Sequence, residues 1–401
     1  MVGASLALAL APLPLNVLAI EAIAPESDTQ PSFDARTTAL SNGSRRILVA
    51  LGAWESIAPQ ATPIRRIHVS ERGAFGSAVL DAKAQGLPAL GYVAENRVIG
   101  RALRQALDRS ARSRLLAPAS VSAVAAGADG VELALETPTG RAVLRARLVV
   151  AADGVGSLVR REAGVGALER EYGQSAVIAT VAPQRFHDHV AYERFTADGP
   201  IALLPAAGGR MGVVWTLAPA AAERALTLAP AAFLAELQRA FGWRVGRLAD
   251  LGARYAYPLA LTRAESQRAL RTAIIGNAAQ GLHPIAGQGF NLGLRDAATL
   301  AETIAESGAD PGSDAVLARY VESRQTDRRA LIAFTDGLVR LFGVDLALFG
   351  AARGLGLLAF DLAPPAKDAL SRLSLGFAER MPRLARGLAL GGAARDDRGA
   401  G

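Results

Sequence analysis

Residues 3–21, GASLALALAPLPLNVLAIE, decide the fold, because a helix pattern and a strand pattern follow each other within this stretch. After Gly3, residues 4–10 contain only alanine, leucine and serine, and a proline follows at position 12, which is typical of a short helix. Residues 15–20 are an apolar run that ends at Glu21 and predict a buried strand. This is the second half of a dinucleotide-binding βαβ unit, where a glycine lets the helix approach the sheet and the acid binds ribose hydroxyls.

The same stretch predicts that part of this unit lies before Met1. If Gly3 is the third glycine of G-x-G-x-x-G, the first two glycines and the preceding strand fall outside the chain. The turn after that strand supplies the amides that bind the pyrophosphate. We therefore expect the chain to have a truncated N-terminus and to be the shortened form of a longer protein.

A secretory signal is the alternative interpretation of this apolar start. Residues 22–24, Ala-Ile-Ala, imitate a signal-peptidase site. Against a signal, no Lys or Arg precedes Arg36, and Pro25 would directly follow the cleavage point. The balance favours a helix and a strand of the mature protein.

The composition excludes several kinds of site. The 401 residues contain no cysteine, which excludes disulfides, a thiolate nucleophile and cysteine-based metal sites. No metal is expected, since the chain has only four histidines, which are His68, His187, His189 and His283. With 51% apolar residues, the chain is long enough for two or three packed domains.

The charge pattern argues against nucleic acid and against a membrane span. The net charge is +7, but the basic residues are nearly all arginines interleaved with acids, which differs from a phosphate-binding stripe. The longest apolar stretch near the C-terminus, residues 341–360, is broken by Asp345 and Arg353. It predicts a core or interface helix.

The remaining periodicity predicts an α/β chain with an inserted, largely antiparallel sheet. We expect helices over residues 38–57 and 96–107 and from residue 296 almost to the end. The expected strands cover residues 67–70, 77–80, 176–181, 190–195, 201–204, 212–217 and 272–275, and a further pair leads to Asp153.

Residues 276–293, GNAAQGLHPIAGQGFNLG, follow an apolar strand and precede a helix. Gly287, Gly289 and Gly293 fall within seven residues and expose backbone amides to a flat or anionic ligand. An ordinary strand-to-helix crossover is the alternative, but such a loop needs no comparable density of Gly, Pro and Asn. The segment therefore predicts a ligand site.

Asp153 and Gly154 end another Val/Ala strand, and Ser157 follows on the next turn. The Asp153 carboxylate has two open interpretations. It can cap the following helix, or it can bind a ribose or a second nucleotide.

Taken together, the order of these segments, with Asp34-Ala35-Arg36 between them, resembles the FAD-dependent aromatic hydroxylases of the group A flavin monooxygenases. The resemblance extends to about residue 380. AYERFT at 191–196, the strand of Trp215, YPLAL at 257–261 and the run 276–296 resemble the ubiquinone-biosynthesis branch of this family.

The resemblance implies a Rossmann-like FAD-binding domain of the α/β class, with an inserted mainly antiparallel β-sheet substrate domain and a helical C-terminal region. It divides the chain into 1–62 (FAD-binding domain, lacking its first strand), 63–90 (strands joining the substrate sheet), 91–172 (FAD-binding domain), 173–265 (substrate domain), 266–305 (flavin loop) and 306–401 (C-terminal helices).

The resemblance also assigns a role to each cofactor-binding residue. Gly3 and Glu21 serve the adenosine end, Arg36 lies near the pyrophosphate or flavin, and Asp153 and Gly154 form the motif shared between FAD and NAD(P)H contact. Gly276 and Asn277 hold the ribityl chain, whereas Pro284, Gly287, Gly289 and Asn291 line the isoalloxazine. Most relatives carry aspartate where this chain has Asn277, which keeps an acceptor oxygen without the charge.

The implied chemistry is reduction of FAD by NAD(P)H, addition of O₂ to give a flavin C4a-hydroperoxide, and oxygen transfer to a polyprenylated phenol. Such chemistry needs few acid or base side chains. His283 is the catalytic candidate, as an aid to phenol deprotonation, and simple packing is the alternative.

Partners and location follow from the resemblance alone. The substrate implies an apolar channel, formed by the sheet and by helices between residues 331 and 377, which are otherwise core and interface. We expect a cytoplasmic protein with peripheral association with the inner membrane or with other quinone-biosynthesis proteins, and a homo-oligomer is compatible with the sequence. The alternative functions are hydroxylation of another phenol and a flavin-free scaffold subunit of a biosynthetic complex.

Overall fold

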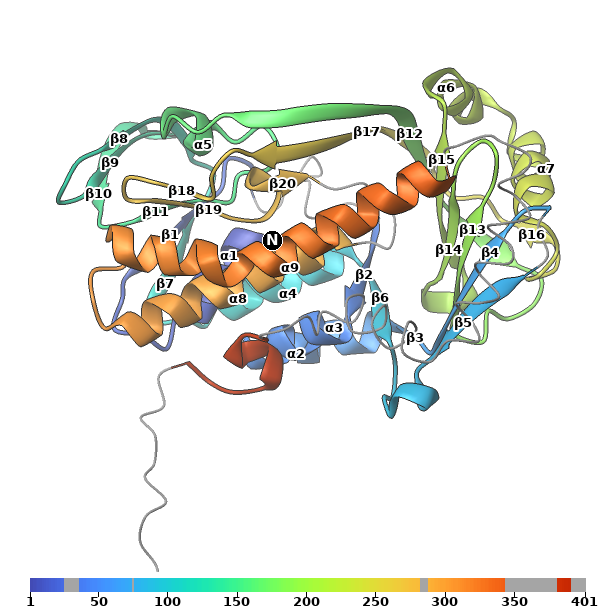
Figure 1. Ribbon diagram of the computed structural model, residues 1–401, viewed down its shortest axis with the longest axis horizontal. Helices are drawn as coiled ribbons and strands as arrows, with labels where there is room; N and C mark the ends of the chain where they lie inside the picture. The colour runs from blue at the N-terminus through green and yellow to red at the C-terminus, as the bar shows by residue number, and fades with distance from the viewer. Residues whose placement is uncertain (25–35, 74–75, 282–287, 343–380, 391–401) are drawn as a thin grey trace, which may run out of the picture.

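The protein is described here by a computed structural model, which covers residues 1–24, 36–73, 76–281, 288–342 and 381–390. It has two units side by side (Figure 1). The first unit contains most of the helices, and the sheet unit contains a large sheet that is antiparallel except for one parallel pair of strands. Long strands run from one unit into the other (Figure 1).

The first unit begins as the sequence predicts. The predicted helix of residues 3–10 is α1 (Val2–Leu10), and the predicted strand is β1 (Val17–Ile20). The leucines of α1 are buried against α4 (Asn96–Asp108) and α8 (Gln288–Ser307) in one hydrophobic core. A Cβ on Gly3 would lie 3.4 Å from Cβ of Ala152, at the near limit of ordinary contact, so the glycine permits this close approach.

The parallel strands of the first unit form two separate pairs among the described residues. β1 pairs with β7 (Ser113–Leu116), and β11 (Val149–Ala151) pairs with β19 (Thr272–Ile274), which also pairs antiparallel with β18 (Arg268–Ala269). Beside them lie the antiparallel strands β8 (Ser120–Ala126), β9 (Val131–Thr137) and β10 (Gly140–Ala146) and the short helix α5 (Leu158–Glu162). This combination confirms the α/β class.

The helix predicted over residues 38–57 was wrong at its start. Thr37–Ser41 form strand β2, which pairs antiparallel with β6 (Gly91–Glu95), and β6 also pairs with β3 (Thr62–Ile64). Helix α2 (Asn42–Ala50) follows, capped by Ser41, whose Oγ accepts a hydrogen bond from the backbone N–H of Ser44 at 3.2 Å. Pairing with a distant strand therefore outweighs the local helical periodicity. A short helix, α3 (Trp54–Ile57), completes the segment.

The sheet unit has nine strands in the order β20-β17-β12-β15-β14-β13-β4-β5, with β16 paired to β12. The nine strands are β4 (Arg66–Glu71), β5 (Ser77–Asp81), β12 (Ala167–Pro183), β13 (Val190–Phe195), β14 (Ile201–Pro205), β15 (Met211–Leu217), β16 (Leu248–Ala249), β17 (Tyr255–Ala264) and β20 (Gln280–Gly281). The strands predicted between residues 67 and 217 are all present, whereas β16, β17 and β20 were not among the predicted strands.

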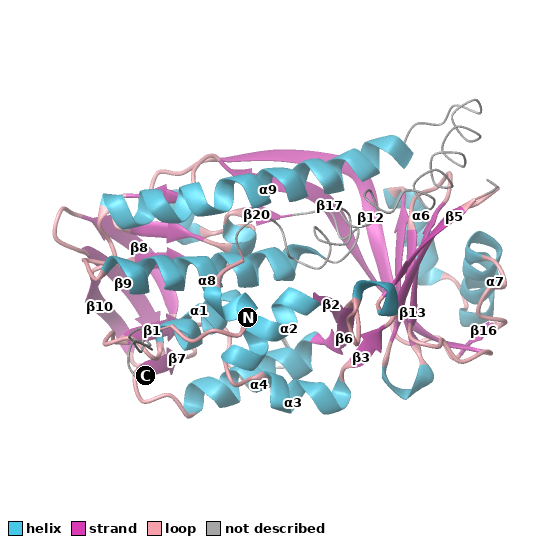
Figure 2. Cartoon of the chain, turned by 60° about the horizontal axis from the view of Figure 1, so that its bottom comes forward, coloured by secondary structure: helices cyan, strands magenta, loops and turns pink. Residues whose placement is uncertain are grey.

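Two helices of this unit were not predicted. α6 (Pro219–Thr227) and α7 (Pro230–Phe241) both begin with proline, and α7 lies on the far side of the sheet from the first unit (Figure 2). Phe233 and Leu237 of α7 pack on Val177 and Trp215 of the sheet. The opposite face of the sheet is therefore the one that meets the first unit.

β12 joins the two units over 17 residues. Its register with β17 shifts between Glu171 and Gln174, and Gly173 within this bulge has a φ of 63°. A non-glycine residue rarely adopts this left-handed conformation. The bulge lies between the part of β12 near the first unit and the part inside the sheet unit.

The described residues after 288 are mainly helical, and the first of these helices starts earlier than expected. α8 begins at Gln288 instead of residue 296, and α9 (Asp314–Phe342) follows it. The apolar stretch 341–360, with Asp345 and Arg353, lies almost wholly outside the described residues. None of the described helices combines the length and hydropathy that a bilayer crossing requires. A short turn, η7 (Arg383–Arg386), packs on α2 and α8.

Candidate functional site

One cavity of about 2340 Å³ lies between the first unit and the sheet unit. It is larger than a typical site for a single small molecule, which is roughly 300–1,000 Å³. Its lining includes eight residues predicted from the sequence, which are Gly3, Glu21, Arg36, Asp153, Gly154, Asn277, Gly289 and Asn291. Gly276 directly precedes the lining residue Asn277, whereas His283, Pro284 and Gly287 lie outside the described residues.

Glu21 stands at the end of β1, at the rim of the cavity. One carboxylate oxygen, Oε1, accepts a hydrogen bond from the backbone N–H of Ile23 at 3.2 Å. The backbone of Glu21 is fixed on both sides, since its N–H donates to Leu116 and its carbonyl accepts from Ala119. The carboxylate is thereby oriented and keeps further acceptor positions for ligand hydroxyls.

Asp153 caps a helix in this structure. Its Oδ1 accepts a 2.5 Å hydrogen bond from the hydroxyl of Ser157, and its Oδ2 accepts from the backbone N–H of Val159 at 3.2 Å. Ser157 in turn caps α5 by accepting from the N–H of Arg160. The capping interpretation of Asp153 is therefore confirmed, while each of its oxygens keeps a second acceptor position toward the cavity.

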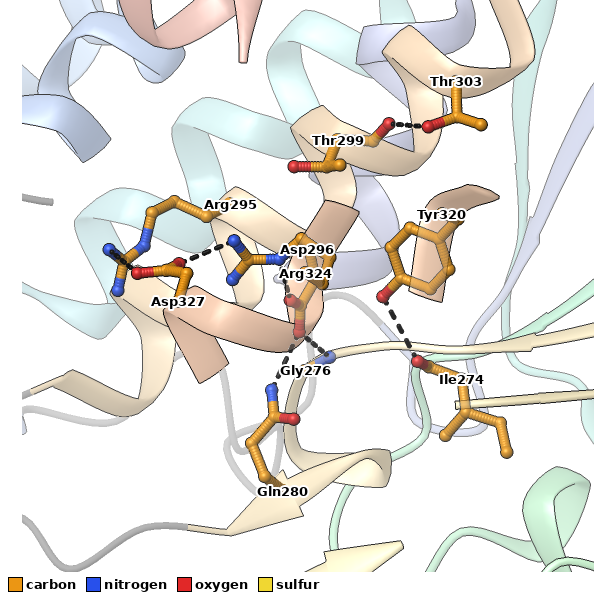
Figure 3. A network of polar contacts seen from close by, with 10 residues as sticks. All are labelled: Ile274, Gly276, Gln280, Arg295, Asp296, Thr299, Thr303, Tyr320, Arg324 and Asp327. Atoms are coloured by element: carbon orange, nitrogen blue, oxygen red, sulfur yellow. Dashed lines mark hydrogen bonds and ion pairs between the residues drawn. The ribbon is translucent and has the colours of Figure 1, made fainter. Parts of the chain in front are cut away.

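The turn at Gly276 is held by a buried carboxylate. Gly276 has a φ of 58°, and its N–H donates to Oδ2 of Asp296 at 3.1 Å. The side-chain amide of Gln280 donates to the same oxygen at 2.8 Å, as Figure 3 shows. These bonds place the exposed side chain of Asn277 at the cavity.

Asp296 belongs to a network of two carboxylates and two guanidinium groups between α8 and α9 (Figure 3). Arg324 donates to Asp296 at 2.8 Å and to Asp327 at 2.6 Å, and Arg295 lies 3.1 Å from Asp327. Burial alone would raise the pKa of Asp327, but the two arginines outweigh it, and the net shift is downward. Each carboxylate of the network therefore has a guanidinium partner.

The sequence analysis missed this network. Its only local signal is the spacing of Arg324 and Asp327, which are three residues apart on α9. The pairing of Arg324 with Asp296 depends on how α8 and α9 pack, and the residue pattern of a single helix does not predict that packing.

Asn291 connects the start of α8 to β2. Its side-chain Oδ1 accepts from the N–H of Ser41 at 2.9 Å, and its Nδ2 donates to the carbonyl of Ala39 at 2.8 Å. The amide thus replaces a neighbouring strand along the edge of β2. This contact fixes the start of α8 against β2, which lines the cavity.

Arg36 is positioned by an aromatic ring of the sheet unit. Its guanidinium carbon lies 4.7 Å from the ring centroid of Tyr257 on β17, within the range of a cation–π contact. Both residues line the cavity. The contact brings a positive charge to the border between the two units.

Glu193 is a further cavity residue to which the sequence analysis gave no role. It lies on β13 between Ala191 and Phe195, and all three line the cavity. Burial raises the pKa of its carboxyl to about 7. Within the described residues, no hydrogen bond or ion pair engages this carboxylate. The signal available in the sequence was the strand alternation of residues 190–195, which puts Glu193 on the same face as two apolar residues.

Comparisons with known proteins agree with this arrangement. The FAD binding domain family matches residues 1–335. Ubiquinone hydroxylase UbiL of Rhodospirillum rubrum is 39% identical over 97% of this chain and 91% of its own length. The 3-demethoxyubiquinol 3-hydroxylase of Escherichia coli is 34% identical over 94% of this chain and 96% of its own length.

A solved structure shows the same fold. The p-nitrophenol 4-monooxygenase PnpA of Pseudomonas putida superposes with a TM-score of 0.76, over 94% of this chain and 96% of that chain. The sequence identity between them is 19%. The fold of the two units therefore belongs to an architecture that tolerates large changes of sequence.

Proposed function

This chain belongs to the FAD binding domain family, and from this premise we propose that it is an FAD-dependent monooxygenase that hydroxylates an aromatic ring in ubiquinone biosynthesis. NAD(P)H is the electron donor and O₂ the second substrate. Two relatives that align over nearly the whole chain are named hydroxylases, one of ubiquinone and one of 3-demethoxyubiquinol. By the same argument, the substrate is a polyprenylated phenol or quinol, such as a 2-polyprenyl-6-methoxyphenol.

The observation that carries the proposal is the composition of the cavity. Glu21, Asp153 and Asn277 come from distant parts of the chain and line one space with the apolar face of the sheet unit. A polar half and an apolar half within one cavity suit a nucleotide cofactor beside a lipid-like substrate.

The residues present fit FAD. A Cβ on Gly289 would project toward Oδ1 of Asn277, 3.9 Å away, so the glycine keeps open the space beside that amide. Gly154 has a φ of 89° and no atom within 4 Å of an added Cβ, so its backbone is accessible. Glu21 and Asn277 offer acceptor oxygens for ribose and ribityl hydroxyls.

Each group of residues then has a separate task. When bound between these residues, FAD would supply the activation of O₂ for transfer to the substrate ring. Glu21 and Asn277 orient the cofactor through its hydroxyls, and the first turn of α8, which contains Gly289, directs backbone amides toward the cavity. The apolar sheet face excludes water and positions the ring. Arg36 contributes a positive charge toward the anionic part of the cofactor.

The test is reconstitution followed by product analysis. The purified chain is mixed with FAD, and its visible spectrum and FAD dissociation constant are measured. It is then supplied with NAD(P)H, O₂ and a short-chain prenylated phenol. We expect a flavin spectrum and a product heavier by one oxygen atom. Absence of FAD binding would favour the flavin-free scaffold, and oxidation confined to other phenols would favour a different hydroxylase.

A pair of glycine variants tests the cavity directly. Gly289→Leu fills the space beside Asn277 and is expected to weaken FAD binding at least about tenfold, equivalent to about 1.4 kcal/mol. Gly156→Leu is the matched control, because Gly156 is exposed, lies outside the cavity lining and has open space around it. Equal FAD affinity in the two variants would contradict this position for the cofactor.

We also propose that the protein contacts the membrane surface through one exposed patch. Phe186 and Trp243 are 58% and 67% exposed, and the exposed residues Arg185, Arg244 and Arg247 lie near them in the sequence. The two segments lie side by side, since the N–H of Arg185 donates to the carbonyl of Val245. Exposed aromatics beside arginines suit an anionic lipid surface. Trp243→Ser should reduce sedimentation with anionic vesicles, and exposed Val143→Ser on β10 is the control. Equal sedimentation of the two variants would contradict the patch.

A further inference from the structure

The face of the sheet that lines the cavity is apolar around Glu193. Strand register places Val69, Glu193 and Ala202 in one row across β4, β13 and β14. The row continues through Val214 of β15 to Ile178 of β12. All five residues line the cavity, and Glu193 alone among them is titratable.

This row lies next to a contact between the sheet unit and β2. In the neighbouring row, a Cβ on Gly212 would lie 2.9 Å from the hydroxyl of Thr37, which starts β2. β2 is in turn fixed to the start of α8 by Asn291. Glu193 therefore stands one row from the place where the polar and apolar halves of the cavity meet.

Few charged groups face Glu193. β14 carries no titratable residue, and Val69 of β4 is its direct neighbour on the other side. On the same face of the sheet, Glu71 is the last residue of β4, and Tyr257 of β17 makes a cation–π contact with Arg36. Burial is the one cause of the raised pKa of Glu193, with no contribution from a neighbouring charge.

We propose that Glu193 is the general base that accepts the hydroxyl proton of the aromatic substrate. The inference rests on the proposed function, since it needs a phenolic substrate in this cavity. In the step, the O–H bond of the phenol breaks and its electron pair remains on the phenol oxygen. The proton forms a new O–H bond with the Glu193 carboxylate and later leaves to water. The resulting phenolate is richer in electrons and reacts faster with an electrophilic oxygen.

Two properties of the site favour this role. A base works best when its pKa lies near the operating pH, and a value of about 7 meets this condition. An ordinary carboxyl, near 4.5, would be a weaker base for a phenol whose pKa is about 10. The carboxylate also has no ion pair to break in the described structure before it accepts a proton.

The test compares Glu193→Gln with the wild type in FAD-reconstituted protein, using a short-chain prenylated phenol. Wild-type kcat for the hydroxylated product should rise with pH through about 7, as the carboxyl ionises. Glu193→Gln keeps the shape of the side chain but cannot accept the proton. We expect it to bind FAD normally, to lose the rising limb and to hydroxylate about 10²- to 10⁴-fold more slowly.

Two further variants complete the experiment. Glu193→Asp keeps a carboxylate and should retain the rising limb at a reduced rate, which also covers a Gln variant that fails to fold. Glu71→Gln, at the end of the neighbouring strand and outside the cavity lining, should leave the pH profile unchanged. An unchanged limb and rate in Glu193→Gln would overturn the proposal and leave the proposed function intact. A wild type that forms no product would overturn both.

A stability measurement gives a second readout, which a purely structural role of Glu193 would not produce. The folded protein holds the carboxyl at a raised pKa, so its contribution to stability is complete at low pH and is lost as the pH rises through about 7. Glu193→Gln should therefore melt at a higher temperature than the wild type above pH 7. A lower melting temperature there would overturn the assignment of an unpaired base in the cavity.

Discussion

The carboxylate of Asp296 lies 2.8 Å from the guanidinium of Arg324, and the two side chains are 0% and 3% exposed. The other oxygen of Asp296 accepts the N–H of Gly276. A single carboxylate therefore connects the packing of α8 and α9 to the turn that presents Asn277 to the cavity.

Asp296→Asn should be strongly destabilising. The substitution leaves the buried guanidinium of Arg324 without one of its two carboxylate partners, and loss of one partner of a buried pair costs about 3–5 kcal/mol. Urea unfolding measures the change in free energy. Glu306→Gln, which removes an exposed pair with Arg319, is the control and should cost less than about 1 kcal/mol. Similar losses of unfolding free energy in both variants would show that the buried network stabilises the protein no more than an exposed ion pair does.

Gly276→Ala should destabilise the turn through conformation and contact. A non-glycine residue in the left-handed region costs about 1–2 kcal/mol. In addition, the new Cβ would meet the methyl groups of Val2 at 3.2 Å. Gly164→Ala, with a φ of 72° and open space, isolates the conformational part. The unfolding free energies should therefore fall further for Gly276→Ala, and an equal fall would mean that Val2 moves aside freely.

Ser157→Ala should cost about 1 kcal/mol, within the range for loss of an N-cap. Exposed Ser122→Ala is the control and should change stability by less than about 0.5 kcal/mol. FAD affinity then separates the two roles of Asp153. If Asp153 also contacts the cofactor, Asp153→Ala weakens FAD binding and Ser157→Ala does not. Unchanged affinity in Asp153→Ala would leave capping as its whole role.

Acidification should destabilise the sheet unit through His187. Burial is the largest cause that lowers the pKa of His187 below 6.5. Its Nδ1 accepts from the N–H of His189 at 3.1 Å, so the folded state requires that nitrogen to be unprotonated. Its stabilising contribution is present above about pH 6.5 and is lost as the pH falls below that value. Urea unfolding above and below this pH should show a smaller change in His187→Gln than in the wild type, and an equal change would contradict the prediction.

The sequence predicts the fold where local pattern and tertiary structure agree. The helix and strand before Glu21 have the expected type, because apolar residues and a proline mark both elements. Residues 38–41 were assigned wrongly, since antiparallel pairing with β6 overrides their helical periodicity. α6 and α7 escaped notice because an Ala-rich segment after a strand carries a weak local signal.

The candidate site is less accessible to sequence reasoning than the fold. Residues that follow a strand or lie in a glycine-rich loop, such as Glu21 and Asn277, were found because their positions have local signatures. Glu193 was not assigned, because its chemistry depends on strands far apart in the sequence that surround it with apolar groups. Asn291 was expected at the cofactor, but its side chain also accepts a hydrogen bond from the N–H of Ser41 in β2. The two residues are 250 positions apart, so the sequence pattern does not indicate this contact.

The continuity of β12 through both units restricts how the cavity can open to admit a large substrate. β12 extends through both units, and a hinge motion that separated the units would have to break its backbone hydrogen bonds with β17. The bulge between Glu171 and Gln174 already interrupts this pairing, and Gly173 there tolerates torsion. Any rotation of the two units that widens the cavity should therefore be centred on Gly173, with the two halves of β12 moving as rigid segments.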